Sequence, residues 1–322
     1  MAETLLEARD LCKYFPVTSG IILRRTRGWV QAVDGINFKV AEGETLGVVG
    51  ESGCGKTTTA KLVLAQEQPT SGSIEFRGQS VANLRRNDLQ DYRRSVQVVF
   101  QDPFSSLSPR MRVGDIIAEP LEVHTDLSRQ GIKSRVGEVL ELVGLQPDDA
   151  RLFPHEFSGG QRQRIAIGRA LSTEAQLIVL DEPVSALDVS IRAHILSLLE
   201  ELQQRLGVSY LFIGHDLAAV AHISHRIAVM YLGKIVELAE SLELCNNPMH
   251  PYTKALFSAS LPSHPDEERE EMVLTGEVPS ALNPPSGCRF HPRCPFVMDH
   301  CSQDEPQLVE VSPEHWVACY LY

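Results

Sequence analysis

The sequence has no long apolar run and no excess of positive charge. No segment approaches the roughly 18 to 20 apolar residues that a helix needs to cross a bilayer, so the chain is not expected to form a membrane pore. The start, Met1-Ala2-Glu3-Thr4, lacks a basic segment followed by an apolar one, and no signal peptide is expected. With 30 Lys and Arg against 42 Asp and Glu, the formal charge is −12. That balance argues against nucleic-acid binding through a broad basic face, because phosphate contacts dominate such affinity.

Cysteine is sparse over most of the chain and crowded at its end. Four of the seven cysteines lie in the last 35 residues. An odd count without a secretory signal indicates a reducing compartment, where thiols bind metal, react or pack. Prolines are frequent after Leu261, so residues 262–322, which we call the tail, are expected to form a small Cys/Pro-rich C-terminal domain that needs a staple.

Residues 5–261 alternate between short apolar runs rich in β-formers and helical segments, which predicts an α/β fold. Residues 1–261 are expected to form one domain, with a helical subdomain at about residues 103–171. The seven expected strands are Thr45–Val49, Ser73–Phe76, Val96–Phe100, Leu177–Leu180, Tyr210–Ile213, Ile227–Met230 and Ile235–Leu238.

A glycine-rich segment follows the first of these runs and precedes a helical segment. It matches the pattern G-x-x-x-x-G-K-[ST] as Gly50-Glu51-Ser52-Gly53-Cys54-Gly55-Lys56-Thr57, followed by Thr58. Such a loop turns its backbone N–H groups toward phosphate oxygens, and the positive end of the next helix faces the same anion. Lys56 is expected to neutralise the β- and γ-phosphates, and the Thr57 hydroxyl to bind Mg²⁺. The order strand, loop, helix therefore predicts a nucleotide-binding site.

An apolar run ending in two acids supplies the carboxylates that such a site needs. Asp181 and Glu182 follow Leu177–Leu180, and ligands collect at the carboxyl end of a buried parallel strand. Asp181 is expected to hold Mg²⁺, and Glu182 to polarise the attacking water as a general base. Alone this pattern is weak, but the glycine-rich loop before it makes it strong.

A second anion site is predicted at a helix start. The residues Ser158-Gly159-Gly160-Gln161 cap a helix over 161–171 and leave backbone N–H groups exposed at its positive end. Because one phosphate site already exists, a second indicates two chains that share nucleotide.

In this order the motifs resemble those of the ATP-binding-cassette family, over about Leu5–Leu261. The resemblance implies that two cassettes close around two ATP molecules, and that Ser158–Gln161 of one completes the phosphate site of the other. It also implies that Gln101 contacts Mg²⁺ or the attacking water, that His215 contacts the γ-phosphate, and that Phe15 stacks on adenine. Tyr14 is a rival for stacking, and core packing is the alternative for both rings.

A narrower resemblance covers nearly the whole chain. Residues 247–253 and 287–295 are similar to those of ATP-binding subunits of oligopeptide and dipeptide importers. That implies an ATP hydrolase on the cytoplasmic face of the membrane, working with a second, different ATPase, two permease subunits and a substrate-binding protein. Nickel, sugar or glutathione as cargo stays open. The alternatives from other classes are a soluble cassette ATPase acting on nucleic acid or the ribosome, which one cassette and the charge disfavour, and a redox or metal sensor.

The four tail cysteines, Cys288, Cys294, Cys301 and Cys319, are separated by five, six and seventeen residues. Four thiolates can bind Zn²⁺ or hold a [4Fe–4S] cluster. Zinc sites usually contain Cys pairs two to four residues apart, and none occurs, so the spacing favours a cluster modestly. The importer resemblance favours it further, because some members carry a [4Fe–4S] cluster in this region. Zn²⁺ and packed free thiols remain alternatives.

Overall fold

The structure is a computed structural model that describes residues 3–19, 25–102, 106–258, 272 and 274–322. The chain divides into two compact units. Unit 1 comprises Met1–Leu5, Val40–Thr45 and Asn83–Phe212, and unit 2 comprises Leu6–Lys39, Leu46–Ala82 and Ile213–Tyr322. The boundaries expected at residues 103 and 262 fall outside the described residues. The described part of the tail belongs to unit 2, together with the glycine-rich loop.

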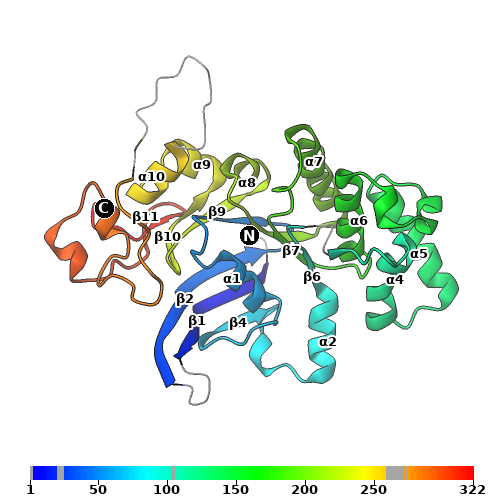
Figure 1. Ribbon diagram of the computed structural model, residues 1–322, viewed down its shortest axis with the longest axis horizontal. Coiled ribbons are helices and arrows are strands. Elements are labelled where there is room, and N and C mark those ends of the chain that lie inside the picture. The colour runs from blue at the N-terminus through cyan, green and yellow to red at the C-terminus, as the bar shows by residue number, and fades with distance from the viewer. Residues whose placement is uncertain (1–2, 20–24, 103–105, 259–271, 273) are drawn as a thin grey trace. The chain divides into compact units, whose positions relative to one another are not determined.

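Among the described residues, unit 1 combines parallel strands with a group of helices (Figure 1). Strands β6 (Val96–Val99) and β7 (Leu177–Asp181) pair in parallel, and β8 (Ser209–Ile213) lies beside β7. The residues of β7 before Asp181 and all of β8 are buried, as expected for strands covered on both faces. The helices are α2 (Arg86–Ser95), α4 (Val113–His124), α5 (Arg129–Leu142), α6 (Gly159–Leu171) and α7 (Val189–Leu206).

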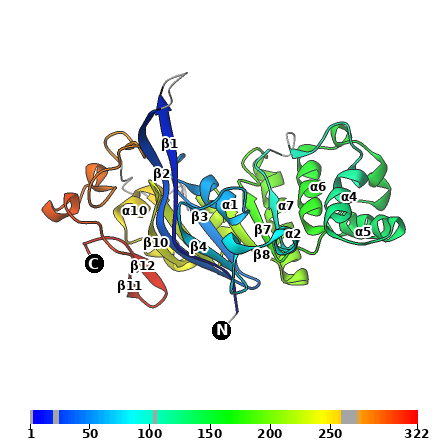
Figure 2. The ribbon, with the colours of Figure 1, turned by 90° about the horizontal axis from the view of Figure 1, so that it is seen from below.

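Helices α4, α5 and α6 pack on one another, as both ribbon views show (Figures 1 and 2). Helix α5 begins at Ser128, whose hydroxyl accepts a hydrogen bond from the Gly131 N–H. It ends just before Gly144, whose φ of 72° only glycine adopts readily. Val139 and Leu140 are buried on its inner face. The helical middle expected from the sequence is confirmed for these elements.

Unit 2 contains an antiparallel sheet in which two long strands lie side by side (Figures 1 and 2). Strands β1 (Thr4–Ser19), β2 (Arg25–Ala41), β4 (Ser71–Phe76) and β5 (Gln79–Ser80) are ordered β2-β1-β4-β5. Neither β1 nor β2 is among the strands expected above. The alternation of buried Ile36, Phe38 and Val40 with exposed Asn37 and Lys39 is the period-two signal that would have predicted β2.

The remaining strands of unit 2 form a mixed sheet ordered β11-β12-β10-β9-β3. Their bounds are β3 (Thr45–Val49), β9 (Arg226–Tyr231), β10 (Lys234–Glu240), β11 (Val309–Ser312) and β12 (His315–Val317). Strand β9 is parallel to β3, and the other neighbouring pairs are antiparallel. The last two strands come from the tail, so the tail extends this sheet.

The helices of unit 2 are α1 (Lys56–Val63), α8 (Leu217–Ile223), α9 (Ser241–Asn246) and α10 (Pro251–Ser258). Helix α9 packs against β9 and β10 (Figure 1). All seven strands expected from the sequence are present, with ends shifted by at most two residues. Among the helices of the described residues, none combines the length and the apolar character that a bilayer span requires.

Candidate active site

The glycine-rich loop joins β3 to α1, and neighbouring strands determine its path. Gly50 has a φ of 150° and Gly55 a φ of 116°, a region that other residues rarely adopt. A Cβ on Gly50 would lie 2.1 Å from the carbonyl oxygen of Met230, and one on Gly55 would lie 2.3 Å from that of Ala32. Both glycines are therefore required by the close approach of β9 and β2 to the loop.

Helix α1 begins at Lys56, directly after Gly55. Because the first N–H groups of a helix have no partner within it, this end attracts anions. The Lys56 side chain is buried, and its ammonium donates to the carbonyl oxygens of Gly50 at 2.7 Å and Glu51 at 3.1 Å. Thr57 is exposed and Thr58 half-buried. The loop thus presents a lysine, a hydroxyl and a helix start within eight residues.

Cys54 is buried, as are Gly50, Gly55 and Lys56, whereas Ser52 and Gly53 are exposed. Burial raises the pKa of the Cys54 thiol above its ordinary value. The Sγ of this neutral thiol lies 3.8 Å from the Lys56 ammonium. This supports a packing role for Cys54.

Glu51 is held at two points by residues far away in the sequence. Its N–H donates to the Tyr252 hydroxyl at 2.8 Å, and its carboxylate accepts two hydrogen bonds from Arg293, at 2.8 and 3.1 Å. The pair with Glu51 raises the pKa of the Arg293 guanidinium, which also lies over the ring of Tyr231. Sequence reasoning missed both partners, because they are 201 and 242 positions from Glu51.

The predicted base and glutamine lie together in unit 1. The Gln101 amide donates to a Glu182 carboxylate oxygen at 2.9 Å. Glu182 follows β7 with a φ of 51°, a strained conformation for a residue with a side chain, of the kind found at active sites. Asp181 is the last residue of β7, and both acids are half-buried.

The predicted second anion site is also in unit 1, and its local structure is as expected. Ser158 is the N-cap of α6: its hydroxyl accepts the Gln161 N–H, and the Gln161 side chain accepts the Ser158 N–H at 2.9 Å. This capping box leaves Ser158 and Gln161 exposed at the positive end of the helix, with Gly160 buried and Gly159 between them half-buried.

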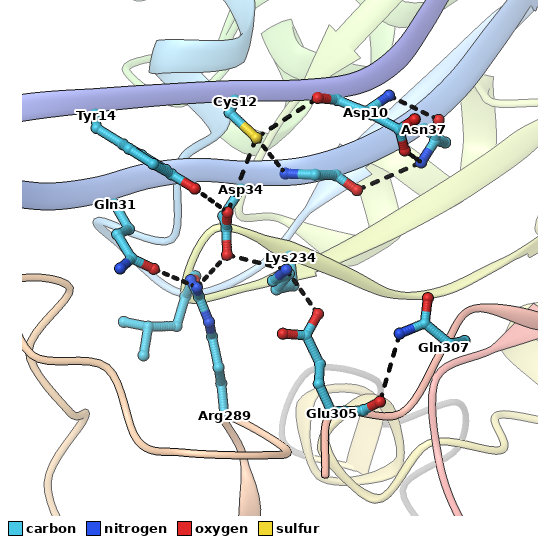
Figure 3. A network of polar contacts seen from close by, with 12 residues as sticks. Asp10, Cys12, Tyr14, Gln31, Asp34, Asn37, Lys234, Arg289, Glu305 and Gln307 are labelled. Atoms are coloured by element: carbon cyan, nitrogen blue, oxygen red, sulfur yellow. Dashed lines mark hydrogen bonds and ion pairs between the residues drawn. The ribbon is translucent and has the colours of Figure 1, made fainter. Parts of the chain in front are cut away.

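His215 and the two candidate stacking rings lie in unit 2. His215 is exposed, in the turn between β8 and α8, where the neighbouring Asp216 caps α8 by accepting the Ala218 and Ala219 N–H groups. On β1 the Tyr14 hydroxyl donates to Asp34 (Figure 3). Neighbouring side chains of a strand point to opposite faces, so Phe15 points away from Asp34. Its ring lies 5.0 Å from the Lys13 ammonium.

The four tail cysteines come together around one small cavity of about 10 Å³, whose wall also includes Phe290 and His291. Burial, with a smaller contribution from the neighbouring thiols, raises the pKa of Cys288 to about 11. Within the described residues, however, no three His, Cys, Asp or Glu side chains are arranged so that they would hold a metal ion. The expected metal site is therefore not confirmed, although the four thiols are neighbours.

Comparison with protein families gives two matches. Residues 33–185 match the family described as "ABC transporter". Residues 236–301 match "Oligopeptide/dipeptide transporter, C-terminal region", which includes three of the four tail cysteines.

Two curated relatives match this chain along nearly their whole length. The oligopeptide transport ATP-binding protein AppF of Bacillus subtilis is 51% identical over 324 residues, covering 99% of this chain and 98% of the relative. The di/tripeptide transport ATP-binding protein DppF of Pseudomonas aeruginosa is 44% identical over 318 residues, covering 99% and 98%.

Two solved structures share the fold. The cassette MJ0796, in a dimeric post-hydrolysis state with ADP and phosphate, aligns with a TM-score of 0.64 at 25% identity, covering 73% of this chain and 98% of that one. The protein cbiO1 of Clostridium perfringens aligns with a TM-score of 0.66 at 26% identity, covering 76% and 92%. The α/β cassette fold expected from the motifs is confirmed.

Proposed function

The chain is a member of the ABC transporter family of ATP-binding proteins, and on that premise we propose that it is the ATP-hydrolysing subunit of a peptide importer. The observation that carries the nucleotide part is the loop of residues 50–57, whose glycines are required by β2 and β9 and whose lysine is buried. A loop of this kind before a helix N-terminus binds phosphate. The names of the relatives support a peptide as cargo.

In this proposal the phosphates of ATP bind to the loop backbone and to the first turn of α1. Lys56 would exchange its bonds to the loop carbonyls for bonds to the β- and γ-phosphate oxygens. The positive end of α1 adds favourable charge at the same place. The proposed nucleotide-binding residues are Gly50, Glu51, Ser52, Gly53, Cys54, Gly55, Lys56, Thr57 and Thr58.

The oxygen donors Thr57, Asp181 and Gln101 suit Mg²⁺, which prefers hard oxygen ligands. When bound with ATP, Mg²⁺ neutralises charge on the phosphates during transfer. Asp181 ends a buried strand, which is where such ligands are usually presented.

Glu182 is the proposed general base. The oxygen of a water molecule attacks the γ-phosphorus, its proton passes to Glu182, and the bond to the leaving ADP breaks. Gln101, which donates to Glu182 at 2.9 Å, would orient the carboxylate and the water. His215 would contact the γ-phosphate.

Phe15 is the proposed platform for adenine. The Tyr14 hydroxyl is engaged with Asp34, which supports Phe15, on the opposite face of β1, over its rival. Ser158, Gly159, Gly160 and Gln161 would act on the nucleotide of a second cassette, because the α6 N-terminus is capped and exposed.

We further propose the assembly around this subunit: a second, different ATPase, two permease subunits and a substrate-binding protein, with this chain peripheral on the cytoplasmic face of the membrane. The match of residues 236–301 to the peptide-transporter region supports this assembly. The relatives' names favour peptide import over a role on nucleic acid or the ribosome, and over nickel or glutathione as cargo.

The tail cysteines are the proposed ligands of a [4Fe–4S] cluster, with Zn²⁺ as the alternative. The cavity that all four line supports them as one site, but at about 10 Å³ it holds no more than a water-sized group, so a cluster would require the thiols to move apart. Anaerobically purified protein should absorb near ~400 nm and contain iron and sulfide. Cys288→Ser should lose them, and Cys245→Ser should not. A colourless protein with zinc supports the alternative, and one without metal contradicts both.

The enzymatic part is tested with purified protein and Glu182→Gln. We expect ATP hydrolysis to fall by roughly 10² to 10⁴-fold, because the water loses its base, while ATP stays bound. Glu201→Gln, an exposed carboxylate on α7, is the matched control and should hydrolyse normally. Normal hydrolysis by Glu182→Gln contradicts the base assignment. Co-purification with permease subunits tests the assembly.

A further inference from the structure

Two arginines of the tail, Arg289 and Arg293, are buried in the part of unit 2 that contains the nucleotide-binding loop. Arg289 is 7% exposed and Arg293 is 8% exposed, and each is adjacent in sequence to a tail cysteine. Long cationic side chains are rarely this buried unless they are paired. Their partners therefore show what the tail is attached to.

Arg289 anchors the segment to β2 and the β9–β10 turn. Its guanidinium donates to Asp34 and to the Gln31 side chain at 2.6 Å (Figure 3). It also donates to the Leu232 carbonyl at 2.5 Å. Asp34 also pairs with Lys234 at 2.9 Å. Burial favours the neutral form of Asp34, but the hydrogen bonds from Tyr14 and Lys234 and the charge of Arg289 hold its pKa below the ordinary value. Asp34 is therefore an ionised hub.

Between the two arginines lies an aromatic contact with the same region. Phe290 is buried and packs against Tyr231 and Tyr252, with ring centroids 5.2 and 5.5 Å away. The hydroxyl of Tyr252 accepts the N–H of Glu51. The short helical turn His291–Arg293 follows directly after Phe290. The packing of Phe290 therefore holds the backbone that carries Arg293 in place.

Arg293 reaches the second residue of the nucleotide-binding loop. Its two terminal nitrogens donate to the two oxygens of Glu51, a bidentate geometry that specifies orientation as well as charge. Without Arg293, a carboxylate in the loop would repel the phosphates that the loop is proposed to bind. Paired with Arg293, the charge of Glu51 is balanced by the guanidinium.

We propose that Arg293 is a positioning residue for nucleotide binding: through Glu51, the tail of a chain sets that chain's own affinity for ATP. This inference rests on the proposed function of the loop. It assigns to the tail a role in cis, separate from any metal bound by its cysteines. Arg293 itself acts through Glu51.

The test measures the dissociation constant of MgATP for the purified full-length chain, by competition with a fluorescent ATP analogue, and the thermal unfolding temperature without nucleotide. Arg293→Met should weaken ATP binding by roughly tenfold or more, because it leaves the Glu51 carboxylate unpaired. Glu51→Gln should tighten ATP binding, because it leaves a cation beside the loop. Arg293→Met combined with Glu51→Gln should return the affinity toward wild type. Arg151→Met, which breaks an exposed pair with Asp148, is the control.

The inference predicts that Arg293→Met weakens ATP binding and that Glu51→Gln strengthens it. If the pair only held the tail against the loop, both variants would weaken ATP binding. Wild-type affinity in Arg293→Met, or weakened affinity in Glu51→Gln, overturns the inference. If Arg293→Met does not fold, the inference is tested with Glu51→Gln and Arg293→Lys. Arg293→Lys should bind ATP more weakly than wild type, but by less than the roughly tenfold expected of Arg293→Met. If the wild type does not bind ATP, the proposed function fails instead.

Discussion

The nucleotide-binding loop and the tail lie in the same unit but are built differently. The loop depends on backbone: Gly50 and Gly55 pass within contact distance of carbonyls from other strands. The described part of the tail has two short strands and brief helical turns. It is attached through the pairing of β12 with β10 and through the side chains of Arg289, Phe290 and Arg293. The nucleotide-binding loop therefore requires a few residue types at fixed spacing. The tail requires residues elsewhere in the chain that can pair with its side chains.

That difference determines what each region tolerates. A Cβ on Gly50 or Gly55 meets backbone, which cannot yield without moving a strand. A changed side chain in the tail loses a contact, and the effect depends on what its partner is left with. Changes to the loop backbone and changes to the tail side chains therefore test the two kinds of construction separately.

The largest effect is expected from Gly55→Ala. The new Cβ would lie 2.3 Å from the Ala32 carbonyl oxygen in a backbone with a φ of 116°, which costs at least about 3 kcal/mol in the loop. We expect ATP affinity to fall by about 100-fold or more and the unfolding temperature to drop. Gly78→Ala is the matched control, with a φ of 72° and no atom within 4 Å. Near-normal ATP binding by Gly55→Ala would contradict a backbone-built loop.

The next effect concerns the join between the tail and the core of unit 2. Glu237 is fully buried: it accepts the Met249 and His250 N–H groups at 2.7 and 2.9 Å and lies 2.7 Å from His315 of β12. Glu237→Leu leaves these groups without a partner, so the free energy of unfolding in urea should fall by about 3 to 5 kcal/mol. Glu277→Leu, at an exposed tail position, should change it little. A loss below about 1 kcal/mol for Glu237→Leu would count against this join.

A smaller effect distinguishes the two aromatic residues of β1. If Phe15 stacks on adenine, Phe15→Ala should weaken ATP binding by roughly tenfold, since a stacked base contributes about 1 to 3 kcal/mol. Tyr14→Phe keeps a ring and loses only the hydrogen bond to Asp34, so its dissociation constant should stay within about twofold. The reverse order of the two constants would make Tyr14 the platform.

The smallest effect, taken over one pH unit, is a pH dependence at the aromatic contact between α10 and the tail. Burial lowers the pKa of His250 to about 3, and its neutral Nδ1 accepts the Tyr252 N–H. In the unfolded chain His250 takes up a proton as the pH falls through about 6.5, whereas the folded chain does so only near 3. Stability is therefore lost as the pH falls between these values, by at most about 1.4 kcal/mol per pH unit.

Other groups titrate in the same window, so the measured quantity is the difference in unfolding free energy between wild type and His250→Gln. That difference should shrink as the pH falls from 6.5. A difference that does not change with pH would show that His250 is protonated alike in both states.

Much of the fold was predictable from residue patterns. The buried strands β3, β7 and β8 are continuous apolar runs, and such runs are a local property of the sequence. Strands β1 and β2 were missed, although alternation at residues 36–40 was available as a signal. The metal site predicted from the four tail cysteines, Cys288, Cys294, Cys301 and Cys319, is not confirmed. The spacing of cysteines along a sequence does not determine how their sulfur atoms are arranged in space.

The sequence by itself determined the family, the loop that is proposed to bind phosphate and the helix start at Ser158, because each depends on residues adjacent in the chain. Only the tertiary structure decided that Arg293 meets Glu51, that Arg289 meets Asp34 and that Tyr14 faces the same hub. These pairs join residues up to 255 positions apart. Side-chain complementarity over such separations leaves no local pattern, since any arginine in the tail could pair with any of the 42 acidic residues until folding brings one of them within hydrogen-bonding distance.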